Sequence, residues 1–86
     1  MANDEQLSIL KQGVDVWNKW RKEHSELEID LYEANFRGVA LRKVDLSRAN
    51  LTGTDFINAD LSEARLIYTD FRSANILAEL YLLGLI

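Results

Sequence analysis

The sequence predicts a β-solenoid that is closed at its N-terminal end by an amphipathic helix. Two periodic signals and one helical signal support this prediction. A large apolar residue recurs every five positions, a small or β-branched residue stands two positions before each of them, and residues 4–23 carry an apolar stripe at helical spacing. A period of five fits neither the helical period of about 3.6 residues nor the alternation of a strand, so the chain must turn a corner in every repeat.

The column of large apolar residues continues without a gap from residue 31 to residue 76, and we expect it to point into the coil. Its members are Leu31, Phe36, Leu41, Leu46, Leu51, Phe56, Leu61, Leu66, Phe71 and Ile76. The small residues two positions earlier predict a second inward column. They are Ile29, Ala34, Val39, Val44, Ala49, Thr54, Ala59, Ala64, Thr69 and Ala74. Between the two columns stand mostly Asp and Asn, which bond back to their own backbone at bends, so this position is expected to face outward.

The form Ala-Asn/Asp-Leu-x-x, seen at residues 49–53 and 59–63, resembles the pentapeptide repeat family. The resemblance covers residues 29–76, and the departures from it include Ala40 and Arg65 at the Asn/Asp position. It implies a right-handed quadrilateral β-helix with four repeats in each coil, here about 2.5 coils. A helix followed by such repeats is similar to bacterial, especially cyanobacterial, members of the family, in which the module is often fused to other domains.

Four repeats in each coil would place residues 20 apart above one another, at a strand spacing of roughly 4.8 Å. The inner ladders expected from this register are Leu31/Leu51/Phe71, Phe36/Phe56/Ile76, Leu41/Leu61 and Leu46/Leu66. On the outside, Lys43 should lie over Glu63 as an ion pair, and Arg48 over Tyr68 as a cation–π contact. Each such surface contact contributes less than about 1 kcal/mol.

Residues 4–23 predict one helix, with Asn3 and Gln6 as an N-capping pair. Gly13 lies inside this helix, where it would cost about 1 kcal/mol relative to alanine. An open solenoid end exposes strand edges and a slice of core, and the helix is expected to cover it. Trp17 and Trp20 are therefore predicted to pack on the first coil rather than to stack on a ligand.

The pattern fails after Ile76, because the next small position is Glu79. The chain thus divides into a capping helix and linker (1–28), the repeats (29–76) and an apolar segment (77–86), together one structural domain. The last segment is a C-terminal cap, a dimerisation patch or a cut through a longer protein. We expect a homodimer through it, with these interface candidates: Leu80, Tyr81, Leu82, Leu83, Leu85 and Ile86.

The sequence offers little catalytic or metal-binding chemistry. It has no cysteine, and His24 is its one histidine, placed near a helix end. Stacked carboxylates such as Asp30 and Asp70 would sit on a flat wall and would not converge on a cation as Ca²⁺ ligands must. We therefore predict no catalytic residue, no cofactor, no metal and no interior pocket. An enzyme or metal-binding protein is the disfavoured third class of function.

The distribution of charge along the chain narrows the remaining classes of function. The net charge is −4, but residues 29–76 hold seven acids and six bases, so the repeats are nearly neutral. Nucleic-acid binding needs a clustered basic face, and a DNA mimic that targets gyrase, as in some relatives, needs a strong negative field. We therefore favour a non-catalytic protein-interaction or scaffold module with an unknown protein partner. The acidic start, the lack of a long apolar run and the lack of cysteine favour the cytoplasm and no membrane contact.

Overall fold

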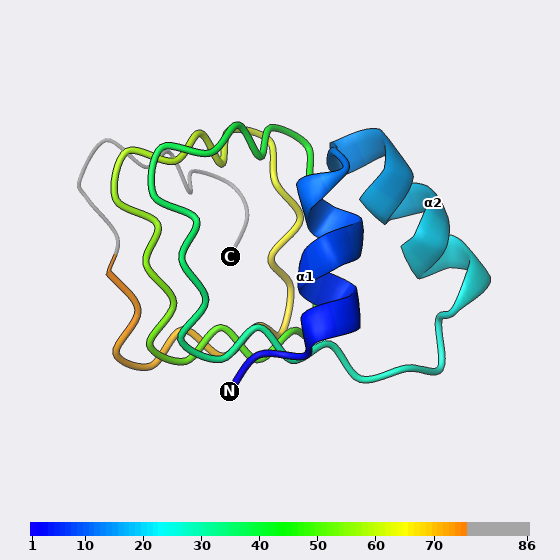
Figure 1. The fold of residues 1–86 in the computed structure, drawn as a ribbon, viewed down its shortest axis with the longest axis horizontal. Coiled ribbons are helices and arrows are strands. Elements are labelled where there is room, and N and C mark those ends of the chain that lie inside the picture. The colour runs from blue at the N-terminus through cyan, green and yellow to red at the C-terminus, as the bar shows by residue number, and fades with distance from the viewer. Residues whose placement is uncertain (76–86) are drawn as a thin grey trace.

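The structure is a computed structural model that describes residues 1–75, which form two short helices followed by a stack of coils (Figure 1). Helix α1 spans Asp4–Lys11 and helix α2 spans Val14–Glu23. Both helices lie at the end of the stack where the repeats begin. Within the described residues the coils contain isolated parallel bridges in place of extended strands.

The coil closes every twenty residues. The parallel bridges join Asp30 to Asn50, Asn35 to Asp55, Ala40 to Asp60, Asp45 to Arg65, Asn50 to Asp70 and Asp55 to Asn75. Each coil therefore has four sides with one bridge position on each. We number the sides by their repeats: side 1 holds 29–33, 49–53 and 69–73; side 2 holds 34–38 and 54–58; side 3 holds 39–43 and 59–63; side 4 holds 44–48 and 64–68.

The predicted inner ladders are confirmed among the described residues. The large inward residues from Leu31 to Leu66 are at most 4% exposed, and Phe71 is partly buried against them. Phe36 and Phe56 stack with their ring centroids 5.7 Å apart, and Phe71 meets Phe56 edge-on at 6.5 Å. Large apolar residues therefore lie on large apolar residues along the coil axis, and neighbouring ladders also touch, which explains how so short a chain builds a continuous core.

The outward Asp and Asn residues bond back to the chain as expected. Their side-chain oxygens accept the N–H of the residue two positions on, as Asp30 does from Tyr32 and Asp60 from Ser62. The same bond recurs at Asn35, Asp45, Asn50, Asp55 and Asp70. Ala40 has no side-chain acceptor to make this bond, so the first turn of side 3 lacks it.

The corners adopt a conformation that the sequence pattern did not predict. Every fifth residue from Glu33 to Ser73 has a positive φ, between 57° and 71°. Gly38 and Gly53 adopt it freely, but Lys43, Arg48 and Tyr68 do so as well. A non-glycine residue pays about 1–2 kcal/mol for this left-handed geometry. The bridges and the inward columns on both sides of each corner hold it in place.

The prediction of a complete second inward column is wrong at Val39, which is 40% exposed. The equivalent residues on sides 1, 2 and 4 of the first coil are Ile29, Ala34 and Val44, and all three are buried. Val39 lies in the first coil, so an inward position there needs cover from the cap. The cap leaves side 3 open, as the contacts described below show.

The prediction of one continuous helix over residues 4–23 is also wrong, because the chain breaks at Gly13. Gly13 has φ 122° and ψ 160°, which a residue with a side chain rarely adopts. The N–H of Gln12 donates to the carbonyl of Ile9 and that of Gly13 to the carbonyl of Leu10, which closes α1; the carbonyl of Gly13 accepts the first bond of α2 from Trp17, at 3.0 Å. The bend lets both helices contact the coil end. Gly13 is thus a hinge point between two helices and not a weakness inside one.

Candidate interaction surfaces

Two side-chain amides close part of the open edge of the first coil. On side 1, Gln6 accepts the N–H of Asp30 (2.8 Å) and donates to the carbonyl of Glu28 (2.8 Å). On side 4, Asn18 accepts the N–H of Asp45 (2.9 Å) and donates to the carbonyl of Lys43 (3.0 Å). Each amide therefore binds an N–H and the carbonyl two residues earlier, and it replaces backbone partners that an additional coil would supply.

Helix α2 adds two further contacts on side 4. The indole N–H of Trp17 donates to the carbonyl of Asp45 at 2.8 Å, and the Trp17 side chain is fully buried. Arg21 donates to the carbonyls of Asp45 and Ser47, both at 3.0 Å. The prediction that Trp17 packs on the first coil is confirmed. Trp20 also packs against the core, and its ring lies 5.2 Å from that of Trp17.

Asp45 and Arg21 form the one charged pair of the cap within residues 1–75. Burial lowers the pKa of Arg21, and Asp45 offsets this in part, at 3.8 Å from the guanidinium. Burial on its own would raise the pKa of Asp45. The hydrogen bonds from Ser47 and the positive charges of Arg21 and Arg65 outweigh it, so this carboxyl has a pKa below its usual range. Asp45 is therefore a carboxylate at neutral pH, and its oxygens are committed to local partners.

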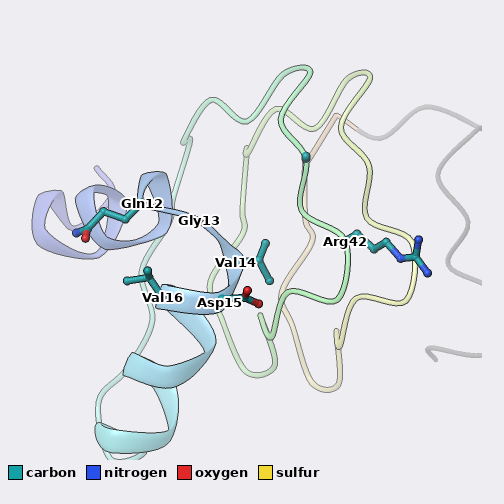
Figure 2. Close-up of a pocket in the computed structure, with 7 residues that line it drawn as sticks. Gln12, Gly13, Val14, Asp15, Val16 and Arg42 are labelled. Carbon is teal, nitrogen blue, oxygen red and sulfur yellow. The ribbon is translucent and has the colours of Figure 1, made fainter.

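Sides 2 and 3 of the first coil are not closed in this way. Within residues 1–75, the backbone N–H groups of Asn35 and Ala40 have no hydrogen-bond partner. Beside Ala40, the bend between α1 and α2 leaves a hollow of about 500 Å³, lined by Gln12, Gly13, Val14, Asp15, Val16, Ala40 and Arg42. Figure 2 shows the Arg42 side chain extending away from the bend, whereas the Asp15 carboxylate lies beside Val14.

Arginine side chains on the coils mostly have acidic partners. Arg37 reaches Asp55 at 3.1 Å, Arg42 reaches Glu63 at 3.1 Å, and Arg72 reaches Asp70 at 2.6 Å. The predicted pair of Lys43 with Glu63 is confirmed, although at 3.9 Å it is longer than that from Arg42. These contacts are exposed and each contributes little to stability.

The remaining two arginines, Arg48 and Arg65, form no ion pair within the described residues. Both line a hollow of about 170 Å³ on side 4, with Ser47, Ile67 and Tyr68. Ile67 is 45% exposed and Tyr68 is 87% exposed. Arg48 and Tyr68 occupy equivalent corners of successive coils, as predicted, but no cation–π contact joins them in the described part of the chain.

The repeats match a known protein family. The family described as pentapeptide repeats matches over residues 29–66 and 41–76, with eight copies, and these ranges together span more than half of the chain. The chain belongs to the pentapeptide repeat family. No curated protein and no solved structure matched it.

The structure also places His24 in this pentapeptide repeat protein. His24 ends α2, where its Nδ1 lies 3.0 Å from the carbonyl of Trp20 and its ring stacks on the Trp20 ring at 5.0 Å. Over residues 1–75, no three acidic, histidine or cysteine side chains gather as a metal site. No helix in that range is long and apolar enough to cross a membrane.

The predicted interface candidates of the C-terminal segment lie outside the described residues. These are Leu80, Tyr81, Leu82, Leu83, Leu85 and Ile86. The structure instead brings together a set of surface residues that the sequence reasoning had not grouped as a site, namely Arg48, Arg65, Ile67 and Tyr68. The sequence did mark one of these residues as unusual, because Arg65 stands at an outward position that Asp or Asn usually occupies.

Proposed function

We propose that this chain is a non-catalytic protein-interaction or scaffold module. The observation that carries the proposal is the packing of the coils. The large inward residues from Leu31 to Leu66 are buried, so a partner must bind to the outer surface. Outer side chains sit on a hydrogen-bonded frame with four sides. Such a frame fixes the spacing of the groups that it displays, as a binding surface requires.

We also propose the handedness and the cross-section of the coil. We take the chain to be a right-handed quadrilateral β-helix of about 2.5 coils, and the four bridge positions per twenty residues support it. The proposal also includes a bacterial origin and a cytoplasmic location, for which the family resemblance and the cysteine-free sequence are the support.

Mimicry of DNA, with gyrase as the target, is the second function considered for a family member of this kind. It requires a continuous negative surface. Here the acidic side chains of Asp55, Glu63 and Asp70 are each paired with an arginine, which cancels the field that mimicry would need. A protein partner with mixed polar and apolar contacts fits these coils better.

The proposal includes self-association through residues 77–86. Their composition supports it, since Glu79 is the one charged residue among apolar ones. Light scattering at tens of micromolar should give the mass of a dimer, and Leu82→Lys or Leu85→Lys should give folded monomers. A monomeric mass for the unchanged protein would refute the dimer and would leave the interaction module intact.

The module itself is tested by photo-cross-linking in the native cells. A benzophenone amino acid is placed in turn at four exposed corner positions, one on each side of the coil: Glu33, Asn58, Lys43 and Tyr68. We expect a discrete protein adduct from one side and weak or diffuse adducts from the others. If none of the four positions gives a discrete protein adduct while the protein is folded and abundant, the interaction function is wrong.

A further inference from the structure

The hollow on side 4 has a backbone that is fixed before any ligand arrives. The N–H of Arg48 donates to the carbonyl of Ile67 at 2.8 Å, and the N–H of Leu46 donates to the carbonyl of Arg65 at 2.9 Å. The corners at Arg48 and Tyr68 have φ values of 61° and 59°. The side chains around the hollow thus leave a rigid frame at set positions, and little backbone ordering is needed on binding.

The two arginines of the hollow form no ion pair within residues 1–75. The other four arginines of the chain each lie within 4 Å of a carboxylate, whereas Arg48 and Arg65 do not within residues 1–75. The carboxylate of Asp45, whose pKa the charge of Arg65 helps to lower, accepts two hydrogen bonds from Ser47, at 2.6 and 3.1 Å, and faces the buried Arg21. It does not neutralise both surface arginines, so the hollow carries net positive charge on a protein whose net charge is −4.

The same hollow carries exposed apolar surface. Tyr68 is 87% exposed and Ile67 is 45% exposed, and both adjoin the two arginines. Tyrosine and arginine are enriched among the residues that dominate protein interfaces. A guanidinium fork binds a planar carboxylate with two parallel hydrogen bonds, and it also stacks on aromatic rings. The hollow therefore offers a cationic part and an apolar part side by side.

The size of the hollow favours a side chain over a cofactor. Its volume of about 170 Å³ is below the range of about 300–1,000 Å³ that small-molecule sites occupy. Nucleic acid is a poorer match, since two cations without a basic stripe neutralise few phosphates. What fits is a short protein segment that presents carboxylates next to a large apolar side chain.

We propose that the hollow formed by Ser47, Arg48, Arg65, Ile67 and Tyr68 binds an acidic segment of a partner protein, with a glutamate or aspartate on the arginines and an adjoining aromatic or aliphatic side chain on Ile67 and Tyr68. This inference rests on the proposed interaction function and names its site and the chemistry of its partner. Within residues 1–75 neither arginine side chain forms a hydrogen bond or an ion pair, so both can be changed without unfolding the coil.

The test is a titration of the ¹⁵N-labelled protein, followed by NMR, with the peptide acetyl-Gly-Glu-Glu-Phe-Leu-Gly-amide. We expect shifts confined to the amides of residues 47–48 and 65–68, with a Kd on the order of 0.1–1 mM for so short a probe. The Gln-Gln version of the peptide should bind at least tenfold more weakly, because it loses the charge on the arginines.

Matched protein variants separate the site from general charge. Arg48→Gln with Arg65→Gln should weaken binding at least tenfold, whereas Arg37→Gln with Arg72→Gln removes the same charge elsewhere and should leave Kd within about twofold. Spectra that are unchanged away from the substituted residues confirm that each variant is folded. Binding that survives the first pair of changes, or an absence of shifts in the hollow, would overturn the site.

Two further outcomes distinguish the source of binding. Inorganic phosphate at the same concentration should shift these amides less than the peptide does; equal shifts would reduce the hollow to an anion site and overturn the apolar half of the inference. If photo-cross-linking captures a protein from another side of the coil while the peptide does not bind, the interaction function stands and the side 4 hollow is wrong.

Discussion

Replacing Gln6 by alanine tests how the cap closes the first coil. The change removes the hydrogen bonds to the N–H of Asp30 and the carbonyl of Glu28, both 2.8 Å long. Gln6 is 5% exposed, so water regains the two backbone groups poorly. A net loss of about 1 kcal/mol for each bond, with an added penalty for the unpaired groups, gives a destabilisation of about 2–3 kcal/mol.

Urea unfolding followed by circular dichroism measures this change as a shift in midpoint at constant slope. Gln12→Ala is the matched control, since Gln12 is exposed and its side chain makes no hydrogen bond in the described structure; we expect it to stay within about 0.5 kcal/mol. Gln6→Glu keeps the size and the acceptor but loses the donor to Glu28, so it should recover little of the stability at pH 7. Equal stability of Gln6→Ala and Gln12→Ala would refute this account of the cap.

Three other perturbations test the core, the bend and the surface charges. Phe56→Ala should cost about 3–5 kcal/mol, because its ring is 1% exposed between those of Phe36 and Phe71; Ser62→Ala, on the outside, should stay within about 0.5 kcal/mol, and equal losses in urea unfolding would show that the inward register is wrong. Gly13→Ala should cost about 1–3 kcal/mol because an alanine is strained at a φ of 122°. An added Cβ would meet no atom within 4 Å, so no steric clash adds to this cost. A gain in stability would indicate one continuous helix. The pKa of Asp70 is lowered to about 2, chiefly by the side-chain hydrogen bond from Arg72, so the stability it contributes is present above the unfolded pKa and is lost as the pH falls through the folded value. A carboxyl ¹³C titration should show this pKa rising toward 3.8 in Arg72→Gln, and an unchanged value would contradict the assignment.

The coil could be predicted from the sequence because its strongest constraint is strictly periodic. Every fifth large residue must be buried, and a repeat of five leaves one way to bury all of them together. Asp30, Asn35 and their equivalents added a second signal, since their backbone bonds are local and do not depend on the rest of the fold. Features that follow from the period alone were therefore recovered with their register.

The cap and the surface hollow could not be recovered in the same way. The bend at Gly13 depends on what both helices contact, and the helical stripe continues through it without a visible break. The role of Gln6 was misread for a similar reason: Asn3 caps α1 as predicted, but the Gln6 side chain serves the coil and does not return to Asn3. The left-handed corners at Lys43 and Tyr68 were missed because neither residue type favours that conformation.

The open sides 2 and 3 follow from the way in which the cap reaches the coil end. Two helices joined by a bend reach two of the four sides at the coil end, so Gln6 and Asn18 can satisfy the edge at Asp30 and Asp45 but not at Asn35 and Ala40. On side 4, the contacts of Trp17 and Arg21 fix the first coil through the carbonyls of Asp45 and Ser47. This side is therefore the most firmly held of the four in the first coil, and it is also the side that displays Arg48, Arg65 and Tyr68. A binding surface benefits from that rigidity, because its side chains are already in position when the partner arrives.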